Sequence, residues 1–350
     1  MAATFLLAAP ALAGEPADAR PADSAQPAPS TLAVSIPSDA GVVLAGTLRI
    51  PAHREGAAVP LAIFVQGHGP NGRGGFDRLM ASLLARGIAT LDYDKRGVGG
   101  STGVYVEDDA ALTRDAVAAV AAMRRHTAID GNRIALIGHS QGGAIIPTVA
   151  AGDPRIAAIV TLAGPVGDGY DLFSRSMHDQ LVLAGKPEAT VAPLVATATD
   201  LIRARVAHAD AATIAQLRHR TIDGFVANGF SRDAAAGALA AIDRDEIYQI
   251  ARTRIATHLK ALRIPVLQVF GALDPFVPGE SSARVARAVL ADNPAAKVVV
   301  FDGMSHWMKD GAVTGSEAEN ETLGANAGSP RVIALVDAWL TPILVGRRQR

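Results

Sequence analysis

One short segment constrains the fold more than any other part of the sequence: Gly-His-Ser-Gln-Gly-Gly at positions 138–143. It directly follows an apolar stretch typical of a strand, residues 133–137, and opens a helix-like segment, residues 141–151. A serine in such a sharp strand-to-helix turn carries its hydroxyl above the edge of a sheet. The flanking glycines lack a Cβ and permit the tight turn. The first N–H groups of the helix point at any negative charge that develops there. The pattern therefore predicts Ser140 as a nucleophile.

Strands and helices alternate on both sides of this segment. The predicted strands lack polar alternation, which is typical of a parallel sheet buried on both faces. Two β-rich runs before them flank a turn and predict an antiparallel hairpin. The expected fold class is therefore α/β: a mostly parallel doubly wound sheet with an N-terminal hairpin. We expect hairpin strands at 31–36 and 42–50, further strands at 61–65, 88–93, 133–137, 156–162, 265–270 and 297–301, and helices at 76–86, 108–126, 141–151, 281–290 and 331–340.

The alternation stops near Gly164 and resumes near Pro265. The segment between them, 168–262, looks helical throughout and predicts a cap inserted into the sheet domain, which then consists of residues 31–167 and 263–350.

The first 30 residues are expected to lie outside this fold. Residues 1–13 form an uncharged apolar run that ends in Ala-Leu-Ala, which favours the end of a secretory signal peptide. Residues 14–30 are rich in Pro and Ala and resemble a solvated linker. The signal would send the protein to the periplasm or the medium, with a cytoplasmic location as the alternative. The run is too short to span a bilayer, and we expect no integral membrane segment.

Composition excludes several classes of protein. Hydrophobic residues make up 49% of the 350 positions, enough for a large core, so the chain is not wholly disordered. Lys plus Arg is 33 and Asp plus Glu is 34, a formal charge of -1, which gives no reason to expect a nucleic-acid partner. The absence of cysteine excludes a thiol nucleophile, a disulfide scaffold and cysteine-ligated metals. The oligomeric state stays open.

A serine nucleophile needs a base and an acid on the same edge of the sheet. On this type of scaffold they follow the serine in the order Asp or Glu, then His. Asp274 comes just after the strand 265–270, and His306 just after the strand 297–301. We expect His306 to accept the proton of Ser140 and Asp274 to orient the imidazole. Asp302 and Asp310 flank His306 and are alternatives for that orienting role.

The sequence holds a second Gly-x-Ser-x-Gly match at 99–103, centred on Ser101. It lies well past the end of the preceding strand, and no helix is expected to begin there. Asp108 is the better candidate for the next helix cap. We therefore interpret the match as a glycine-rich loop.

Acyl transfer also needs N–H donors for the tetrahedral oxyanion. One should be the backbone N–H of Gln141, beside the nucleophile. The other should come from the glycine-rich loop 66–72, where Pro70 has no N–H to offer. His68 and Gly69 remain, and we favour His68.

Taken together, these residues resemble the α/β-hydrolase superfamily from about residue 31 to residue 340. The segment 138–143 resembles its nucleophile elbow. The segment 92–99, Asp-Tyr-Asp-Lys-Arg-Gly-Val-Gly, resembles the loop after the fourth strand in many bacterial members. The loop Gly-His-Gly-Pro at 67–70 is similar to the Gly-Ser-Gly-Pro oxyanion loop of a bacterial serine-esterase branch, with His68 in place of the serine. The resemblance implies hydrolysis of carboxylic esters through an acyl-enzyme, without a metal or organic cofactor.

We therefore expect a carboxylesterase that acts on a small-molecule ester with a short to medium acyl chain or a small aromatic group. An amidase or aminopeptidase is the first alternative, and it would need a carboxylate for the substrate amine, with Asp168 and Asp171 as candidates. A ligand-binding protein without activity is the second alternative. The sequence leaves the natural substrate open.

Overall fold

The computed structural model describes residues 29–54, 56–183, 185–324 and 328–346. The predicted signal segment, 1–13, and nearly all of the predicted linker, 14–30, lie outside these residues.

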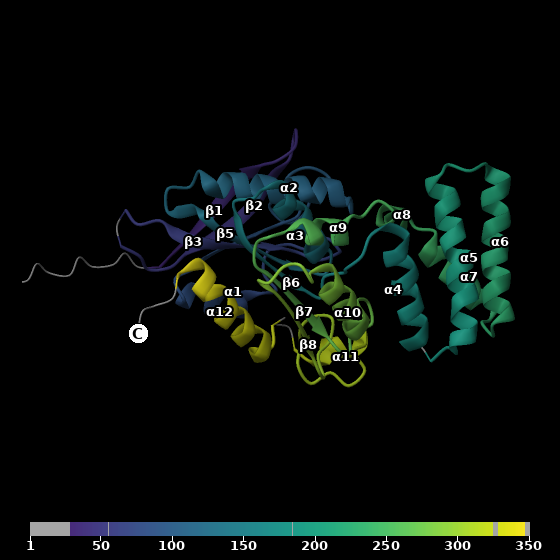
Figure 1. The fold of residues 1–350 in the computed structure, drawn as a ribbon. Helices are drawn as coiled ribbons and strands as arrows, with labels where there is room; N and C mark the ends of the chain where they lie inside the picture. The colour runs from purple at the N-terminus through teal and green to yellow at the C-terminus, as the bar shows by residue number, and fades with distance from the viewer. Residues whose placement is uncertain (1–28, 55, 184, 325–327, 347–350) are drawn as a thin grey trace, which may run out of the picture.

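Eight strands form a single sheet, and this confirms the predicted α/β class (Figure 1). Their order across the sheet is β1-β2-β4-β3-β5-β6-β7-β8. The hairpin strands β1 and β2 pair antiparallel, β2 pairs antiparallel with β4, and every later pairing is parallel. The strands are β1 (Ser30–Pro37), β2 (Val43–Ile50), β3 (Val59–Val65), β4 (Ala89–Tyr93), β5 (Ile129–His139), β6 (Ile156–Leu162), β7 (Val266–Gly271) and β8 (Ala296–Phe301).

Helices cover both faces of the sheet, as the unbroken apolar strands require. On one face, α1 (Asp77–Ala85) and α12 (Pro330–Leu344) bury one side of the strands under leucine, methionine and valine side chains. On the other face lie α2 (Asp109–Arg124), α3 (Gln141–Gly152), α9 (Ile255–Ala261) and α10 (Gly279–Val289). With both faces covered, the carboxyl ends of the parallel strands are left to build a site.

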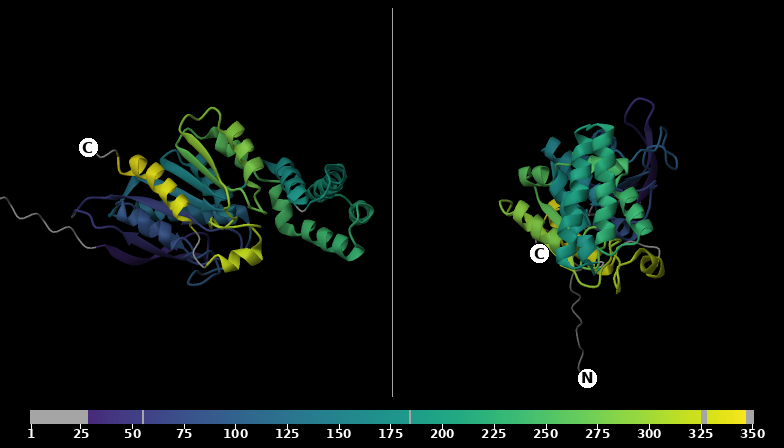
Figure 2. Two further views of the ribbon diagram at one scale, coloured as in Figure 1. Left: turned by 90° about the horizontal axis from the view of Figure 1, so that it is seen from below. Right: turned by 90° about the vertical axis from the view of Figure 1, so that its right-hand side faces the viewer.

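A helical block stands between β6 and β7. It consists of α4 (Gly169–Leu183), α5 (Glu188–Val206), α6 (Ala211–Ala227), α7 (Arg232–Ile242) and α8 (Asp245–Ile250). Figures 1 and 2 show these helices projecting away from the sheet on one side of the molecule. They enclose an apolar cluster of their own, which includes Leu194, Leu201 and Phe225. The assignment of 168–262 as a cap domain stays a prediction.

Three elements differ clearly from the sequence expectation, and one of them, α12, ends at Leu344 rather than at 340. Strand β5 runs from Ile129 to His139, longer at both ends than the expected 133–137, because it pairs with two neighbours up to the elbow itself. Helix α11 (Glu317–Thr322) was not expected. Its signal was present in the sequence, because Ser316 caps the helix and accepts the N–H of Glu319 three residues later.

Candidate active site

Ser140 sits in a strained backbone conformation between β5 and α3. Its φ is 51° and its ψ is -117°, in a region that residues with a Cβ rarely adopt. The neighbouring glycines make this turn possible: a Cβ on Gly142 would lie 2.0 Å from the carbonyl oxygen of Val65, and one on Gly138 would lie 2.4 Å from the backbone of Gly142. Strand β3 therefore presses directly against the turn that presents the hydroxyl.

The structure brings the three predicted residues together. The Oγ of Ser140 lies 3.0 Å from Nε2 of His306, and Nδ1 of His306 lies 2.7 Å from Oδ2 of Asp274. A carboxylate only accepts, so His306 donates from Nδ1 and leaves Nε2 free to accept the serine proton. Asp274 and His306 are both buried, which strengthens the bond between them.

The loop after β7 holds Asp274 rigidly. Its second oxygen, Oδ1, accepts the backbone N–H groups of Phe276 and Val277, each at 2.8 Å. The alternative orienting residues are placed elsewhere, since Asp310 pairs with Arg331 and the side chain of Asp302 makes no hydrogen bond in the described part of the chain. Asp274 is the carboxylate that contacts His306.

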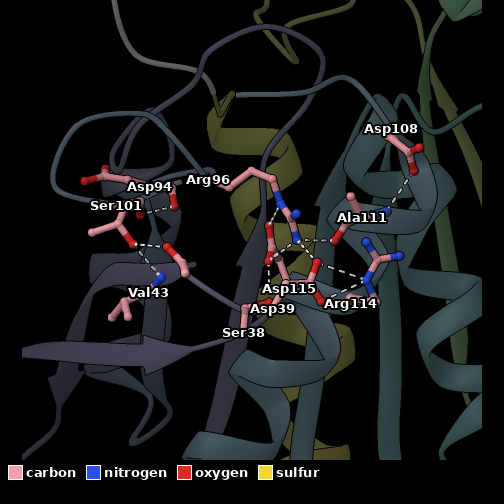
Figure 3. Close-up of polar contacts among 12 residues, drawn as sticks. Ser38, Asp39, Val43, Asp94, Arg96, Ser101, Asp108, Ala111, Arg114 and Asp115 are labelled. Carbon is pink, nitrogen blue, oxygen red and sulfur yellow. Dashed lines mark hydrogen bonds and ion pairs between the residues drawn. The ribbon is translucent and has the colours of Figure 1, made fainter. Parts of the chain in front are cut away.

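Ser101, in the second Gly-x-Ser-x-Gly match, has a different environment (Figure 3). Its hydroxyl donates to the carbonyl of Asp94. It also accepts the N–H of Ala45, so it fastens the loop to β2. The expected cap of α2 is present at Asp108, which accepts the N–H of Ala111. The same loop is anchored by Arg96, whose buried guanidinium binds Asp115 at 2.7 and 2.8 Å. These contacts give Ser101 a structural role.

The loop after β3 lies against the nucleophile. A Cβ on Gly67 would lie 3.2 Å from the Cβ of Ser140, so the two backbones are in close contact. The N–H of Gly69 donates to Glu107 at 2.6 Å and is therefore occupied. Within the described residues, the N–H groups of His68 and Gln141 have no acceptor, and these two remain as candidate oxyanion donors.

Two aromatic side chains, Trp307 and Phe276, pack against the imidazole of His306. Trp307 stands nearly perpendicular to it at 5.5 Å, and Phe276 approaches its edge at 5.1 Å. Phe276 is 46% exposed although it is large and apolar. An exposed aromatic wall beside the base suits an apolar substrate group.

Sequence analysis assigned no role to the His139 side chain beyond the turn. In the structure its Nε2 lies 2.9 Å from the backbone carbonyl of His306, so His139 donates to that carbonyl and helps to hold the base. Burial, together with the nearby charge of His306, lowers the pKa of His139 to about 3. His139 is thus a neutral donor at physiological pH.

Sequence analysis also missed a buried polar group behind the nucleophile, formed by Lys95, Glu107 and Asp109. Lys95 and Asp109 both bind the side chain of Gln141. Burial raises the pKa of Asp109, with a further contribution from the negative charge of Glu107.

The two candidate amine-binding carboxylates lie at the entrance of the helical block. Asp168 is occupied: it accepts the N–H groups of Ala256 and Thr257 and the hydroxyl of Thr257. It therefore caps α9. Asp171, in the first turn of α4, is exposed.

Two cavities, of about 470 and 510 Å³, lie in the helical block, and neither is lined by Ser140 or His306. In the part of the chain that the structure describes, no cluster of three or more His, Asp or Glu side chains is arranged to hold a metal. No helix there has the length and apolar character needed to cross a membrane.

Comparison with known proteins gives a family. Residues 59–309, well over half of the chain, match the family described as "Serine aminopeptidase, S33". The quorum-quenching protein AidA of Acinetobacter baumannii is 34% identical over 122 residues, which are 34% of this chain and only 39% of that protein's length.

Among solved structures, the α/β-hydrolase GrgF from Penicillium sp. sh18 is similar, with a TM-score of 0.54 at 17% identity, over 90% of this chain and 99% of that one. The esterase Pf2001 of Pyrococcus furiosus has a TM-score of 0.52 at 14% identity, over 89% and 93% of the two chains. At these identities the similarity establishes the fold.

Proposed function

The chain belongs to the serine aminopeptidase S33 family of α/β-hydrolases, and from that premise we propose that it is a carboxylesterase with Ser140, His306 and Asp274 as its catalytic residues. The observation that supports the proposal most is the continuous hydrogen-bonded series from Ser140 through His306 to Asp274, at 3.0 and 2.7 Å.

The mechanism follows from these contacts. His306 takes the proton of Ser140 at Nε2 while the oxygen attacks the ester carbonyl, and Asp274 stabilises the imidazolium that forms. The N–H groups of Gln141 and His68 bind the resulting oxyanion. His306 then gives its proton to the departing alcohol, and an acyl-enzyme remains on Ser140. Water, activated by His306, attacks this acyl group and releases the acid.

The substrate class is inferred from the site walls. Phe276 and Trp307 present apolar rings beside His306, which suits short to medium acyl chains or small aromatic esters. The net charge of -1 provides no general attraction for a charged polymer. The proposal includes export, which is supported only by the uncharged apolar run at residues 1–13.

The test compares hydrolysis of p-nitrophenyl esters of graded acyl length by the native protein and by Ser140→Ala. We expect the variant to lose activity by about 10³-fold or more, because the hydroxyl is the covalent centre. A fluorophosphonate probe should label the native protein at Ser140 only. Native activity that survives the substitution would disprove the assignment.

The peptidase alternative rests on the family's description. Against it stands Asp168, whose carboxylate is occupied by the end of α9. Amino-acid anilides assayed beside simple esters decide between them: a higher kcat/KM on the anilides would replace the esterase proposal.

A further inference from the structure

The two candidate oxyanion donors come from separate parts of the chain. Gln141 begins α3, whereas His68 lies on the loop after β3. An oxyanion hole works only when both N–H groups are fixed at the right separation before the reaction starts. Some contact must therefore hold the loop and the helix start in a constant relation.

Glu107 holds the loop side. Its Oε1 accepts the N–H of Gly69 at 2.6 Å and the hydroxyl of Tyr105. Its other oxygen, Oε2, lies 3.4 Å from Nδ1 of His68. Burial opposes ionisation of this carboxyl, but the hydrogen bonds and the charge of Lys95 outweigh it, and the pKa of Glu107 lies below its usual value. The residue next to the candidate donor is thus fixed by a carboxylate.

Lys95 holds the helix side. Its Nζ donates to Oε1 of Gln141 at 3.0 Å, and the amide of Gln141 in turn donates to Asp109 at 3.0 Å. Both hydrogen-bonding ends of the Gln141 side chain are therefore occupied. The Lys95 side chain is only 4% exposed, and its Nζ lies 3.5 Å from Oε1 of Glu107. Glu107 and Lys95 together connect the loop at Gly69 with the helix start at Gln141.

We propose that the buried Lys95–Glu107 pair is the positioning element that fixes the two oxyanion donors relative to each other. The inference rests on the proposed function. A buried ion pair adds little to stability compared with an apolar pair of the same size. Here its contacts end on the two segments that carry the donors, and a small displacement of either segment weakens transition-state binding steeply.

The test uses the full chain with Glu107→Ala and Glu107→Gln. We expect Glu107→Ala to lower kcat on a p-nitrophenyl ester by about 10- to 100-fold with KM within about twofold, because only the tetrahedral state needs the donors. Affinity for a boronic acid, which forms a tetrahedral adduct on the serine, should fall by a similar factor. Glu107→Gln should recover most of kcat, since its amide oxygen still accepts the N–H of Gly69.

Lys95→Met tests the other end of the pair. It should lower kcat about tenfold. The kcat of the double variant Glu107→Ala/Lys95→Met should be no lower than that of the less active single variant, because the effects of residues that act as a unit are not additive. Lys95→Met, measured by kcat and by boronate affinity, carries the test alone if Glu107→Ala does not fold.

The matched control is Asp337→Asn. Asp337 is a carboxylate of similar burial that pairs with Arg86 and Ser82 on the opposite face of the sheet. It should lower the melting temperature and leave kcat and boronate affinity unchanged.

Two failures are distinguishable. If the native protein hydrolyses no ester, the proposed function fails. If the native protein is active and Ser140→Ala is inactive, but the Glu107 and Lys95 variants keep native kcat and boronate affinity, only the positioning role is refuted. The same holds if the losses in the two single variants multiply in the double variant.

Discussion

At the scale of single residues, the turn at Ser140 shows how close backbone contacts determine which residue types a position can hold. Ser140 adopts its positive φ only because β3 and α3 fix the turn from both sides. Hydrogen bonds to His306 come from three directions: Asp274, Ser140 and, through the main chain, His139.

Gly142 and Gly152 lie in the same helix and should respond oppositely to alanine. In Gly142→Ala the new Cβ would be 2.0 Å from the Val65 carbonyl oxygen. The backbone of β3 would have to move to relieve this clash, which costs free energy. We expect the free energy of unfolding to fall by about 3 kcal/mol or more, and we expect the variant to lose activity as well. At Gly152 nothing lies within 4 Å of the new methyl, so Gly152→Ala should gain about 0.5 kcal/mol. Urea unfolding measures both, and similar values for the two variants would contradict the steric argument.

His139 gives the fold a defined pH dependence. In the unfolded chain it binds a proton below about pH 6.5, whereas in the fold it stays neutral down to about pH 3. The unfolded state then holds more protons, so stability must fall as the pH drops below 6.5. The slope should average about 1 kcal/mol per pH unit, slightly less than the value for a full proton, because the imidazole of the unfolded chain is only partly protonated near pH 6.5.

The measurement is urea unfolding between pH 6.5 and 5, above the range in which carboxylates with lowered pKa values, such as Glu107, begin to contribute. His139→Gln keeps a donor for the His306 carbonyl and should flatten the slope. An equal slope in both proteins would show that His139 is not the titrating group. His178 is half-buried, and its bonds to Glu188 and Asp179 raise its pKa, so its effect on stability falls mainly above this window.

At the scale of elements, local patterns predicted most of the sheet domain. The apolar strands, the turn glycines and the order Ser140, Asp274, His306 are all readable from neighbouring residues. The partners of Lys95, Glu107 and His139 are not, because their contacts join positions 46, 38 and 167 residues apart. A local sequence pattern does not predict contacts between positions so far apart. Nor does it distinguish a charged loop residue that the fold buries from one that stays in solvent.

Asp168 shows the same limit, since its carboxylate was a candidate for substrate binding and instead caps α9. We expect Asp168→Ala to cost about 1 kcal/mol, the typical value of a lost cap, and to leave kcat on simple esters within about twofold. Thermal unfolding and ester kinetics check this. A selective rise in KM for amino-acid anilides would return Asp168 to the substrate site.

At the scale of the whole molecule, the helical block has an apolar cluster separate from the two that cover the sheet. Phe225→Ala, in the middle of that cluster, should cost about 3–5 kcal/mol, because it removes a buried ring and leaves a cavity. The block should then open at a lower temperature than the sheet domain, giving two unfolding transitions.

Limited proteolysis at intermediate temperature identifies the part that opens, with cleavage expected between 169 and 250. Phe270→Ala, in strand β7, is the matched variant. It should instead lower the temperature at which the sheet domain unfolds. A single shared transition in both variants would mean that block and sheet unfold as one unit.

The ends of the helical block meet. The N–H of Gly169 donates to the carbonyl of Thr253, 84 positions further along the chain. The backbones of Asp168 and Arg254 form an isolated antiparallel β-bridge. Strands β6 and β7 are neighbours in the sheet, so the intervening chain must close before they can pair. Closing a long flexible chain is entropically costly. A block that has already folded presents its two ends side by side and turns this closure into a short hairpin-like step. We expect this contact to favour assembly of the helical block before β6 and β7 pair. It also marks the point where the block could be excised or exchanged while β6 and β7 remain neighbours.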